Sequence, residues 1–345
     1  MTDIAAETTL QQRRPAPGGG WFALLWCLAA ALLLCQAIIW YKPETPMLAV
    51  LDQFAIQLAG IALCAALLAL ALRRWIHVLV LATLAATLAW PTFTPRADAA
   101  TIVEPGRLKV LSANLWARAS GHELTIKALL ASDADIIGLI EVAPKWQSAL
   151  APLFAKYPYR VDCLDVDPRC QTMLLSRLPI TKPIAGRIWK ATPIVAGGEV
   201  LWNGRPITVL ATHWFRPLVR SDQSPWGAED PGRSAYLAEG LPVSRQAGQA
   251  GLFAKYLNRQ PQDVILMGDL NSVPWSRVQR AFRDKTGLDS QAGWASSWPS
   301  YLPWPLRLPI DHVLARGHLI VTNYATDSRT DSDHLPVIAE IGWHD

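Results

Sequence analysis

The sequence predicts an α/β domain preceded by helices that cross a membrane. Long apolar segments occupy the chain before residue 101, and short apolar runs alternate with helix-like polar stretches after it. Short apolar runs between helices are typical of the strands of an α/β domain. Polar residues recur directly after these runs, where strand ends form the sites of such domains.

The N-terminal part is expected to be a tail followed by a membrane anchor. Residues 1–20 are polar and end in a Pro/Gly-rich run, which predicts a flexible cytoplasmic tail. The run from Trp21 to Tyr41 is uncharged and long enough to cross a hydrocarbon core of roughly 30 Å. Two further apolar segments complete an anchor over residues 21–93, so that the expected spans are 21–41, 54–72 and 75–93.

Basic residues predict the orientation of the anchor. Arg13 with Arg14, and Arg73 with Arg74, lie on one side if all three segments cross, and that side should be cytoplasmic. The following domain then faces the periplasm of a bacterial inner membrane; if only two segments cross, it is cytoplasmic. A signal peptide is a rival interpretation of the first segment, and the sequence around Ala97-Asp-Ala99 resembles a cleavage site after the third.

Two cysteines bear on the same question. Cys163 and Cys170 are close enough in sequence to close a small loop. In an oxidising compartment we expect them to pair, and free thiols remain the alternative.

A linker, residues 94–106, leads to a domain over residues 107–345. Glu123 to Ala131 and Ser244 to Leu257 have the patterns of helices, and residues 214–242, rich in Pro, Gly and charge, predict a long loop. The expected strands are 108–112, 136–140, 173–175, 207–211, 264–269, 310–314 and 337–341.

The strand beginning at Val264 is followed by the pair of residues most suggestive of chemistry. It delivers Asp269 and Asn271 at its end, just after Gly268. A carboxylate can orient or deprotonate a water while a neutral amide holds a phosphoryl oxygen, which suits phosphate ester hydrolysis. Taken alone, the stretch is more typical of an Asx-type turn that caps the next helix, and only the rest of the chain favours the chemical interpretation.

Six short motifs, in order, resemble the endonuclease/exonuclease/phosphatase superfamily, which has the deoxyribonuclease I fold. They are SANLW around Asn114, ADIIGLIEV around Glu141, TH at Thr212-His213, GDLNSVP around Asp269, IDHVL around Asp311 and SDHLPV around Asp333. The resemblance implies a four-layer sandwich of two packed mixed β-sheets flanked by helices. It also implies hydrolysis of phosphate esters.

The resemblance further implies a metal site. Glu141 would be the principal ligand, with Asn114 beside it and Asp333 as a further contributor. Oxygen ligands favour Mg²⁺ or Mn²⁺, and no Cys/His cluster with zinc spacing occurs in the sequence.

The same resemblance assigns catalytic roles to five residues. Asp269 would orient or activate water, and Asn271 would hold a phosphate oxygen. His334, paired with Asp311, would act as a base or as a phosphate-binding cation. His213 would be the acid or phosphate ligand opposite.

The expected function is therefore that of a membrane-anchored, metal-dependent phosphoesterase. A phosphodiesterase or nuclease is favoured; a phospholipid head-group phosphodiesterase, a phosphomonoesterase and a catalytically inert binding protein are the alternatives. The formal net charge of +4 is too small to indicate nucleic acid as a partner. The lipid bilayer is the expected partner of the N-terminal helices, and no segment indicates a protein partner.

Residues outside these motifs receive simpler interpretations. His312 and His318 match no motif and are expected at the surface. The aromatic residues of the C-terminal third are expected in the core, with base stacking or a membrane interface as the alternative; they are Trp275, Trp294, Trp298, Tyr301 and Trp304.

Overall fold

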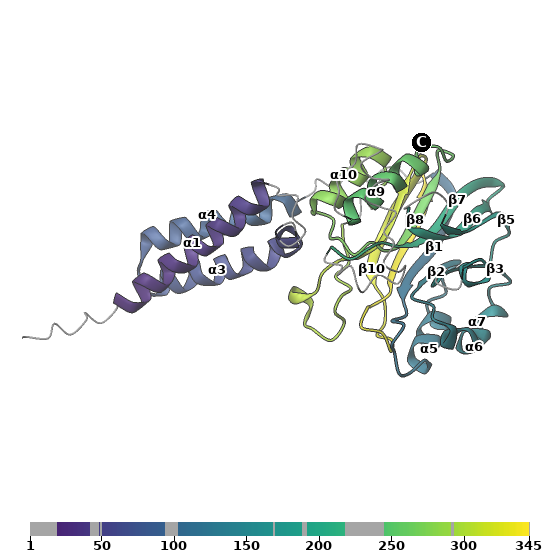
Figure 1. Ribbon diagram of the computed structural model, residues 1–345, viewed down its shortest axis with the longest axis horizontal. Coiled ribbons are helices and arrows are strands. Elements are labelled where there is room, and N and C mark those ends of the chain that lie inside the picture. The colour runs from purple at the N-terminus through teal and green to yellow at the C-terminus, as the bar shows by residue number, and fades with distance from the viewer. Residues whose placement is uncertain are drawn as a thin grey trace, which may run out of the picture.

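The computed structural model describes residues 19–41, 48, 50–93, 103–167, 170–187, 192–217, 245–290 and 293–344. The expected tail, the connection 42–46 and most of the expected linker and of the loop 214–242 lie outside these residues. In the described part, an elongated bundle of N-terminal helices lies beside a larger α/β domain (Figure 1). This bundle is the expected anchor and is called the anchor below.

The anchor contains three helices that are long and apolar enough to span a membrane, as predicted. They are α1 (Gly19–Tyr41), α3 (Ala55–Ala71), preceded by the 3₁₀ turn η1 (Val50–Phe54), and α4 (Trp75–Ala89), followed by η2 (Trp90–Thr92). Helix α3 buries a row of alanines, whose small side chains let neighbouring helices approach closely. Between α4 and α1, the Thr87 hydroxyl donates a hydrogen bond to Gln36 Oε1 over 3.1 Å.

The domain contains two mixed β-sheets. The first has the strand order β10-β11-β1-β2-β4-β3, and the second β5-β6-β7-β8-β9. The strands of the first sheet are β1 (Val103–Asn114), β2 (Ile136–Ile140), β3 (Tyr159–Asp162), β4 (Thr172–Ser176), β10 (Leu319–Thr326) and β11 (Val337–Trp343). Those of the second are β5 (Ile180–Arg187), β6 (Ile194–Trp202), β7 (Arg205–His213), β8 (Val264–Asp269) and β9 (Asp311–Arg316).

The domain has four layers, as the resemblance implied. The main core joins the facing sides of the two sheets, with Val110 and Ile136 from one and Val209 and Ile265 from the other. Outside the first sheet lie α5 (Glu123–Ala131), α6 (Pro144–Ala149) and α7 (Ala151–Phe154). Outside the second lie α9 (Arg245–Leu257) and α10 (Arg277–Thr286). Each helical layer buries its apolar side on a sheet.

Several elements were missed from sequence for identifiable reasons. Strand β5 is an edge strand whose residues are mostly exposed or half-buried, so it lacks an apolar run. Strand β6 contains Gly197-Gly198, which resembles a turn. A Cβ at Gly197 would overlap the Val209 carbonyl oxygen of β7, so close strand packing requires this glycine. Strand β1 begins at Val103, inside the segment expected to be the linker.

Two smaller expectations have clear outcomes. Cys163 and Cys170 form a disulfide, with their Cα atoms 5.4 Å apart. The surface assignment of His312 is wrong. Its side chain is buried and contacts the Ser272 carbonyl oxygen through Nε2 at 2.7 Å, because the loop after β8 packs against the start of β9. His318 is exposed, as expected.

Candidate active site

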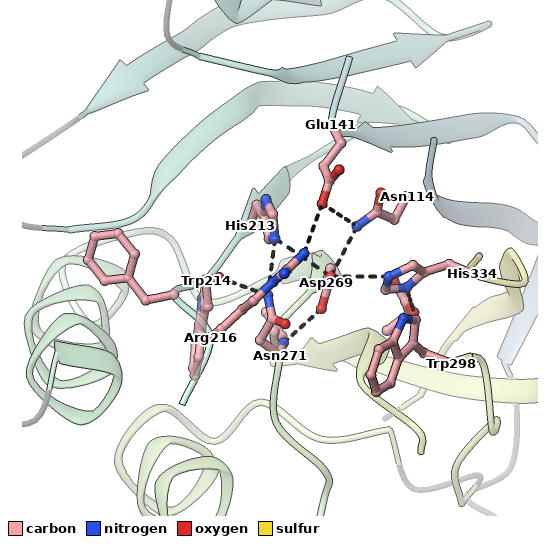
Figure 2. A network of polar contacts seen from close by, with 12 residues as sticks. Asn114, Glu141, His213, Trp214, Arg216, Asp269, Asn271, Trp298 and His334 are labelled. Atoms are coloured by element: carbon pink, nitrogen blue, oxygen red, sulfur yellow. Dashed lines mark hydrogen bonds and ion pairs between the residues drawn. The ribbon is translucent and has the colours of Figure 1, made fainter. Parts of the chain in front are cut away.

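The candidate site lies where strands of both sheets end together. Parallel strands β1 and β2 end side by side with Asn114 opposite Ile140, just before Glu141. In the other sheet, His213 is paired with Asp269, and Asp269 with Asp311 on the next strand. Figure 2 shows Asn114, Glu141, His213, Asp269, Asn271 and His334 directed toward one shared space.

The backbone at Glu141 turns sharply to present its side chain. Its φ is +60°, a left-handed conformation that costs energy for a residue other than glycine. Glu141 Oε2 accepts a hydrogen bond from the Ala117 N–H at 2.9 Å, and Oε1 accepts one from Asn114 Nδ2 at 3.2 Å. Burial alone would raise the pKa of Glu141, but attraction to His213 and these hydrogen bonds outweigh it, so the pKa is lowered. Glu141 is therefore a carboxylate at neutral pH.

Asp269 is the buried centre of the network, with 2% of its surface exposed. Its Oδ2 accepts from Asn114 Nδ2 at 3.1 Å, and its Oδ1 accepts from the Asn271 N–H at 2.8 Å. Burial and repulsion from Asp311 raise the pKa of Asp269. A carboxylate with a raised pKa is a better proton acceptor, as a group that activates water must be.

His334 and Asp311 form the closest charge pair of the site. His334 Nδ1 lies 2.8 Å from Asp311 Oδ2, which also accepts from the Ser297 hydroxyl at 2.6 Å. Burial alone would lower the pKa of His334, but attraction to Asp311, Asp269 and Asp333 outweighs it and raises the pKa to about 9. The predicted His/Asp couple is present, and its imidazole is a cation at neutral pH.

His213 and Asn271 lie side by side on the opposite edge of the site. Asn271 Nδ2 is 3.0 Å from His213 Nε2 and donates to the Trp214 carbonyl at 2.9 Å. His213 Nε2 lies 3.6 Å from Asp269 Oδ2. Asn271 also has a left-handed backbone, with φ +47°. These two contacts fix the orientation of the Asn271 amide beside the His213 imidazole.

The side-chain contacts of Asp333 are with Trp298 and His334 and do not include Glu141. Its Oδ2 accepts from Trp298 Nε1 at 3.2 Å, and its Oδ1 lies 4.0 Å from His334 Nε2. Among the described residues, that Oδ1 is buried and has no hydrogen-bond partner. No contact joins Asp333 to Glu141 directly, although both line the same cavity.

The oxygen atoms at the site fit a divalent cation. Glu141 is ionised and lines the cavity, and the unpartnered Asp333 oxygen supplies a second hard donor there. A different set, Asp269, Asp311 and His334, places ligand atoms within 4.8 Å of one another. In that set Asp311 already pairs with His334 Nδ1, so the close approach of these atoms is accounted for by an ion pair without a metal.

A cavity of about 500 Å³ opens beside these residues. Sequence analysis did not single out Arg118 or Arg216, both of which line it. Arg216 Nη2 lies 3.9 Å from Glu141 Oε1. Arg216 follows His213 by only three residues, and that proximity was the one available indication. Val50, Gln53 and Phe54 of the anchor also line the cavity, and no local sequence pattern predicts that contact.

Comparison with known proteins identifies the family of the domain. The profile of the Endonuclease/Exonuclease/phosphatase family matches residues 111–334. No curated protein sequence matches the chain.

Solved structures share the fold at low sequence identity. A functionally unknown conserved protein from Enterococcus faecalis V583 is 14% identical, with TM-score 0.51, over 68% of this chain and 100% of that one. Humanized TDP2 from D. rerio is 14% identical, with TM-score 0.50, over 68% and 99%. Sphingomyelinase C from Streptomyces griseocarneus is 17% identical, with TM-score 0.47, over 68% and 99%.

Proposed function

The chain belongs to the endonuclease/exonuclease/phosphatase family, and on this premise we propose that it is a membrane-anchored, divalent-metal-dependent phosphodiesterase. Water attacks the phosphorus of a phosphate ester, and the ester oxygen leaves with a proton. The observation that carries the proposal is the joint presence of an ionised Glu141, a buried Asp269 of raised pKa and the His334–Asp311 pair around one cavity.

Each residue has a role that follows from its contacts. Asp269, a proton acceptor held by Asn114 and Asn271, orients the attacking water. Cationic His334 offers its Nε2 side to a phosphate oxygen, while Asp311 fixes the other ring nitrogen. His213, beside Asn271, is placed to donate a proton or a hydrogen bond to the ester.

Glu141, with Asn114 beside it and Asp333 across the cavity, would hold Mg²⁺ or Mn²⁺. Such a cation, when bound, neutralises the charge that builds on the phosphoryl oxygens. Arg118 and Arg216 add positive charge to the same cavity and support the binding of an anionic ester.

The anchor supports a periplasmic site. Turn η1 and the end of α4 lie on the same side of a membrane if both α3 and α4 cross it, and on opposite sides if only one of them crosses. Asp52 and Gln53 of η1 contact the domain that follows α4, a contact that a membrane would prevent if α4 did not cross. The contact therefore favours crossing by both α3 and α4. The basic pairs Arg13-Arg14 and Arg73-Arg74, both expected in the cytoplasm, add the crossing of α1 and orient the domain toward the periplasm.

Hydrolysis of bis-p-nitrophenyl phosphate by the full chain in detergent tests the proposal. We expect turnover that requires Mg²⁺ or Mn²⁺, disappears with a chelator and falls by at least about 100-fold in Glu141→Gln and in His334→Gln. His318→Gln, at an exposed histidine, is the matched control and should retain activity. Turnover of p-nitrophenyl phosphate instead would identify a phosphomonoesterase. A folded, metal-binding chain without turnover of either ester would indicate the non-catalytic alternative.

A further inference from the structure

The turn that begins the second span packs directly onto the catalytic loop. Gln53 Oε1 accepts a hydrogen bond from the Val273 N–H at 2.9 Å, and Asp52 Oδ2 accepts one from the Arg277 N–H at 2.8 Å. The Asp52 carbonyl accepts from Trp275 Nε1 at 3.0 Å. Val273 and Trp275 belong to the loop that follows Asn271, and Arg277 is the first residue of α10, so the anchor contacts the loop that positions the Asn271 amide and the helix that follows it.

An apolar cluster reinforces this contact. Ala55, the first residue of α3, is 2% exposed and packs in one cluster with Val273, Trp275, Leu308 and Ile310. Trp275 is buried, as expected, but the cluster that buries it includes Ala55 of the anchor. Gln53 is also buried, with 5% of its surface exposed. Such burial on both sides indicates a fixed interface between anchor and domain.

The cavity that contains the catalytic groups is completed by the anchor. Phe54 and Val50 line it together with Leu308 and Ile310. Its polar part is lined by Arg216, Glu141, Asn271 and His334. The cavity is therefore amphipathic: one part suits a phosphate and another suits apolar groups. Since α3 starts at Ala55, the apolar wall adjoins the start of a membrane-spanning helix.

Exposed aromatic residues lie at the same end of the anchor. Tyr301 and Trp304, each 69% exposed, belong to a segment that includes η5 (Trp304–Leu306), and Gln57 of α3 donates a hydrogen bond to Pro305 of that segment over 3.4 Å. Trp90, at the end of α4, is 77% exposed. Exposed aromatics at the ends of spanning helices are typical of the interface between headgroups and acyl chains. The segment lies on the anchor side of the domain (Figure 1).

From these observations we infer that residues of the anchor form part of the active-site cavity. The substrate is then a lipid at the membrane surface, whose phosphate ester headgroup enters the cavity. This inference rests on the proposed function and names its substrate class. The phosphate would enter the polar part, and the glycerol and upper acyl region would lie along Phe54 and Leu308. Nucleic acid fits less well, because the chain has a net charge of only +4 and so offers little attraction to a polyanion.

The test compares each headgroup with and without its acyl chains. The full chain, reconstituted in vesicles with Mg²⁺, is given phosphatidylethanolamine, phosphatidylglycerol or phosphatidic acid. Parallel reactions contain the deacylated glycerophosphate esters, a single-stranded DNA oligonucleotide or bis-p-nitrophenyl phosphate. We expect kcat/KM for at least one lipid to exceed that of its deacylated counterpart by at least about 100-fold, which corresponds to about 2.7 kcal/mol of added binding.

Two variants separate membrane contact from general loss of activity. Trp304→Asp should lower kcat/KM on lipid about tenfold, because the lipid substrate requires contact with the bilayer. The kcat/KM of the same variant on soluble bis-p-nitrophenyl phosphate should stay within about twofold of the wild-type value. Leu201→Asp is the matched control at an exposed apolar residue of β6, a strand on the side of the domain away from the anchor, and should change neither rate.

The contact between Gln53 and the catalytic loop has its own test. Gln53→Ala should lower kcat on every substrate about tenfold with little change in KM, because the Val273 N–H loses its acceptor and Asn271 loses its support. Gln53→Glu keeps an acceptor oxygen and should restore much of kcat.

The outcomes distinguish the two proposals. Metal-dependent turnover of bis-p-nitrophenyl phosphate with no preference for lipids over deacylated esters, or with faster cleavage of DNA, would overturn this inference and leave the proposed function standing. Unchanged kcat in Gln53→Ala would overturn the role of the anchor as a wall of the site. Absence of all phosphate ester hydrolysis would refute the proposed function and this inference with it.

Discussion

Two Asp–His pairs in the domain differ in burial, and the difference separates the proposed catalytic couple from a surface contact. Asp311 and His334 are 0% and 4% exposed and line or adjoin the cavity. Asp263 and His318 are 3.1 Å apart at the surface. Water screens the second pair, whereas low polarity strengthens the attraction of the first.

This contrast predicts the effect of removing one charge. Asp311→Asn preserves the shape of the side chain but removes the attraction that keeps His334 protonated. We expect kcat on a phosphodiester to fall by about 10²–10⁴-fold, and the pH range of activity to move to lower pH. Steady-state kinetics between pH 5 and 10 measure both effects. Asp263→Asn is the control; a comparable loss in that variant would show that the effect is not specific to the buried pair.

His312 predicts how stability depends on pH. Burial lowers the pKa of His312 to about 4, from about 6.5 in an unfolded chain. Between these values the unfolded state binds the proton and the folded state does not, so stability is lost as pH falls from 6.5 to 4. The size of this loss is on the order of 3 kcal/mol.

His312→Gln can still donate to the Ser272 carbonyl and cannot be protonated. We expect thermal unfolding in detergent to shift less between pH 7 and pH 4.5 in this variant than in the wild type. His318→Gln, at an exposed histidine, should retain the wild-type dependence on pH. Equal shifts in all three proteins would contradict the role of His312.

At the scale of elements, strand β8 places its catalytic residue only because the preceding residue is glycine. Gly268 has φ +146°, and a Cβ there would overlap the Thr212 carbonyl oxygen of the neighbouring strand β7. The two strands are paired at this level with His213 opposite Asp269. Their close approach therefore sets the distance between two site residues.

Gly268→Ala is expected to reduce stability by more than about 3 kcal/mol and to abolish activity, because both backbone conformation and space are unfavourable. Gly204→Ala is the matched control: its φ is +77°, but no atom lies within 4 Å of the added Cβ. That variant should cost about 1 kcal/mol and remain active. Denaturation and activity of the two variants give the comparison, and similar losses in both would show that close strand packing contributes little.

The arrangement of the whole molecule predicts the compartment of the domain. If three helices cross, Cys163 and Cys170 face an oxidising periplasm and should be paired in cells. In a variant whose Cys27, Cys35 and Cys64 are replaced by serine, maleimide should label the chain only after reduction. Alkaline phosphatase fused to the C-terminus should also be active. Direct labelling together with an inactive fusion would contradict the three-span arrangement.

Sequence patterns located the three apolar helices and the central strands, and the family resemblance supplied the eight candidate site residues. Helices α5 and α9 and strand β2 agree with expectation within a residue, because their burial is periodic or continuous along the chain. Edge strands β5 and β10 were missed because neighbouring strands and sheet pairing stabilise them, and a local pattern contains neither.

The tertiary structure decided which residues and elements contact one another at the site. The order of six motifs could indicate the family and its expected catalytic residues, since those residues follow strand ends that the chain itself encodes. It could not place Asp333 against Trp298, bury His312 or bring Phe54 of the anchor into the cavity beside Glu141 and His334. Contacts between residues more than two hundred positions apart, such as Gln53 and Val273, depend on how the folded anchor and sheets pack together. Local sequence determines the elements and their chemistry, and packing determines which of them form one site.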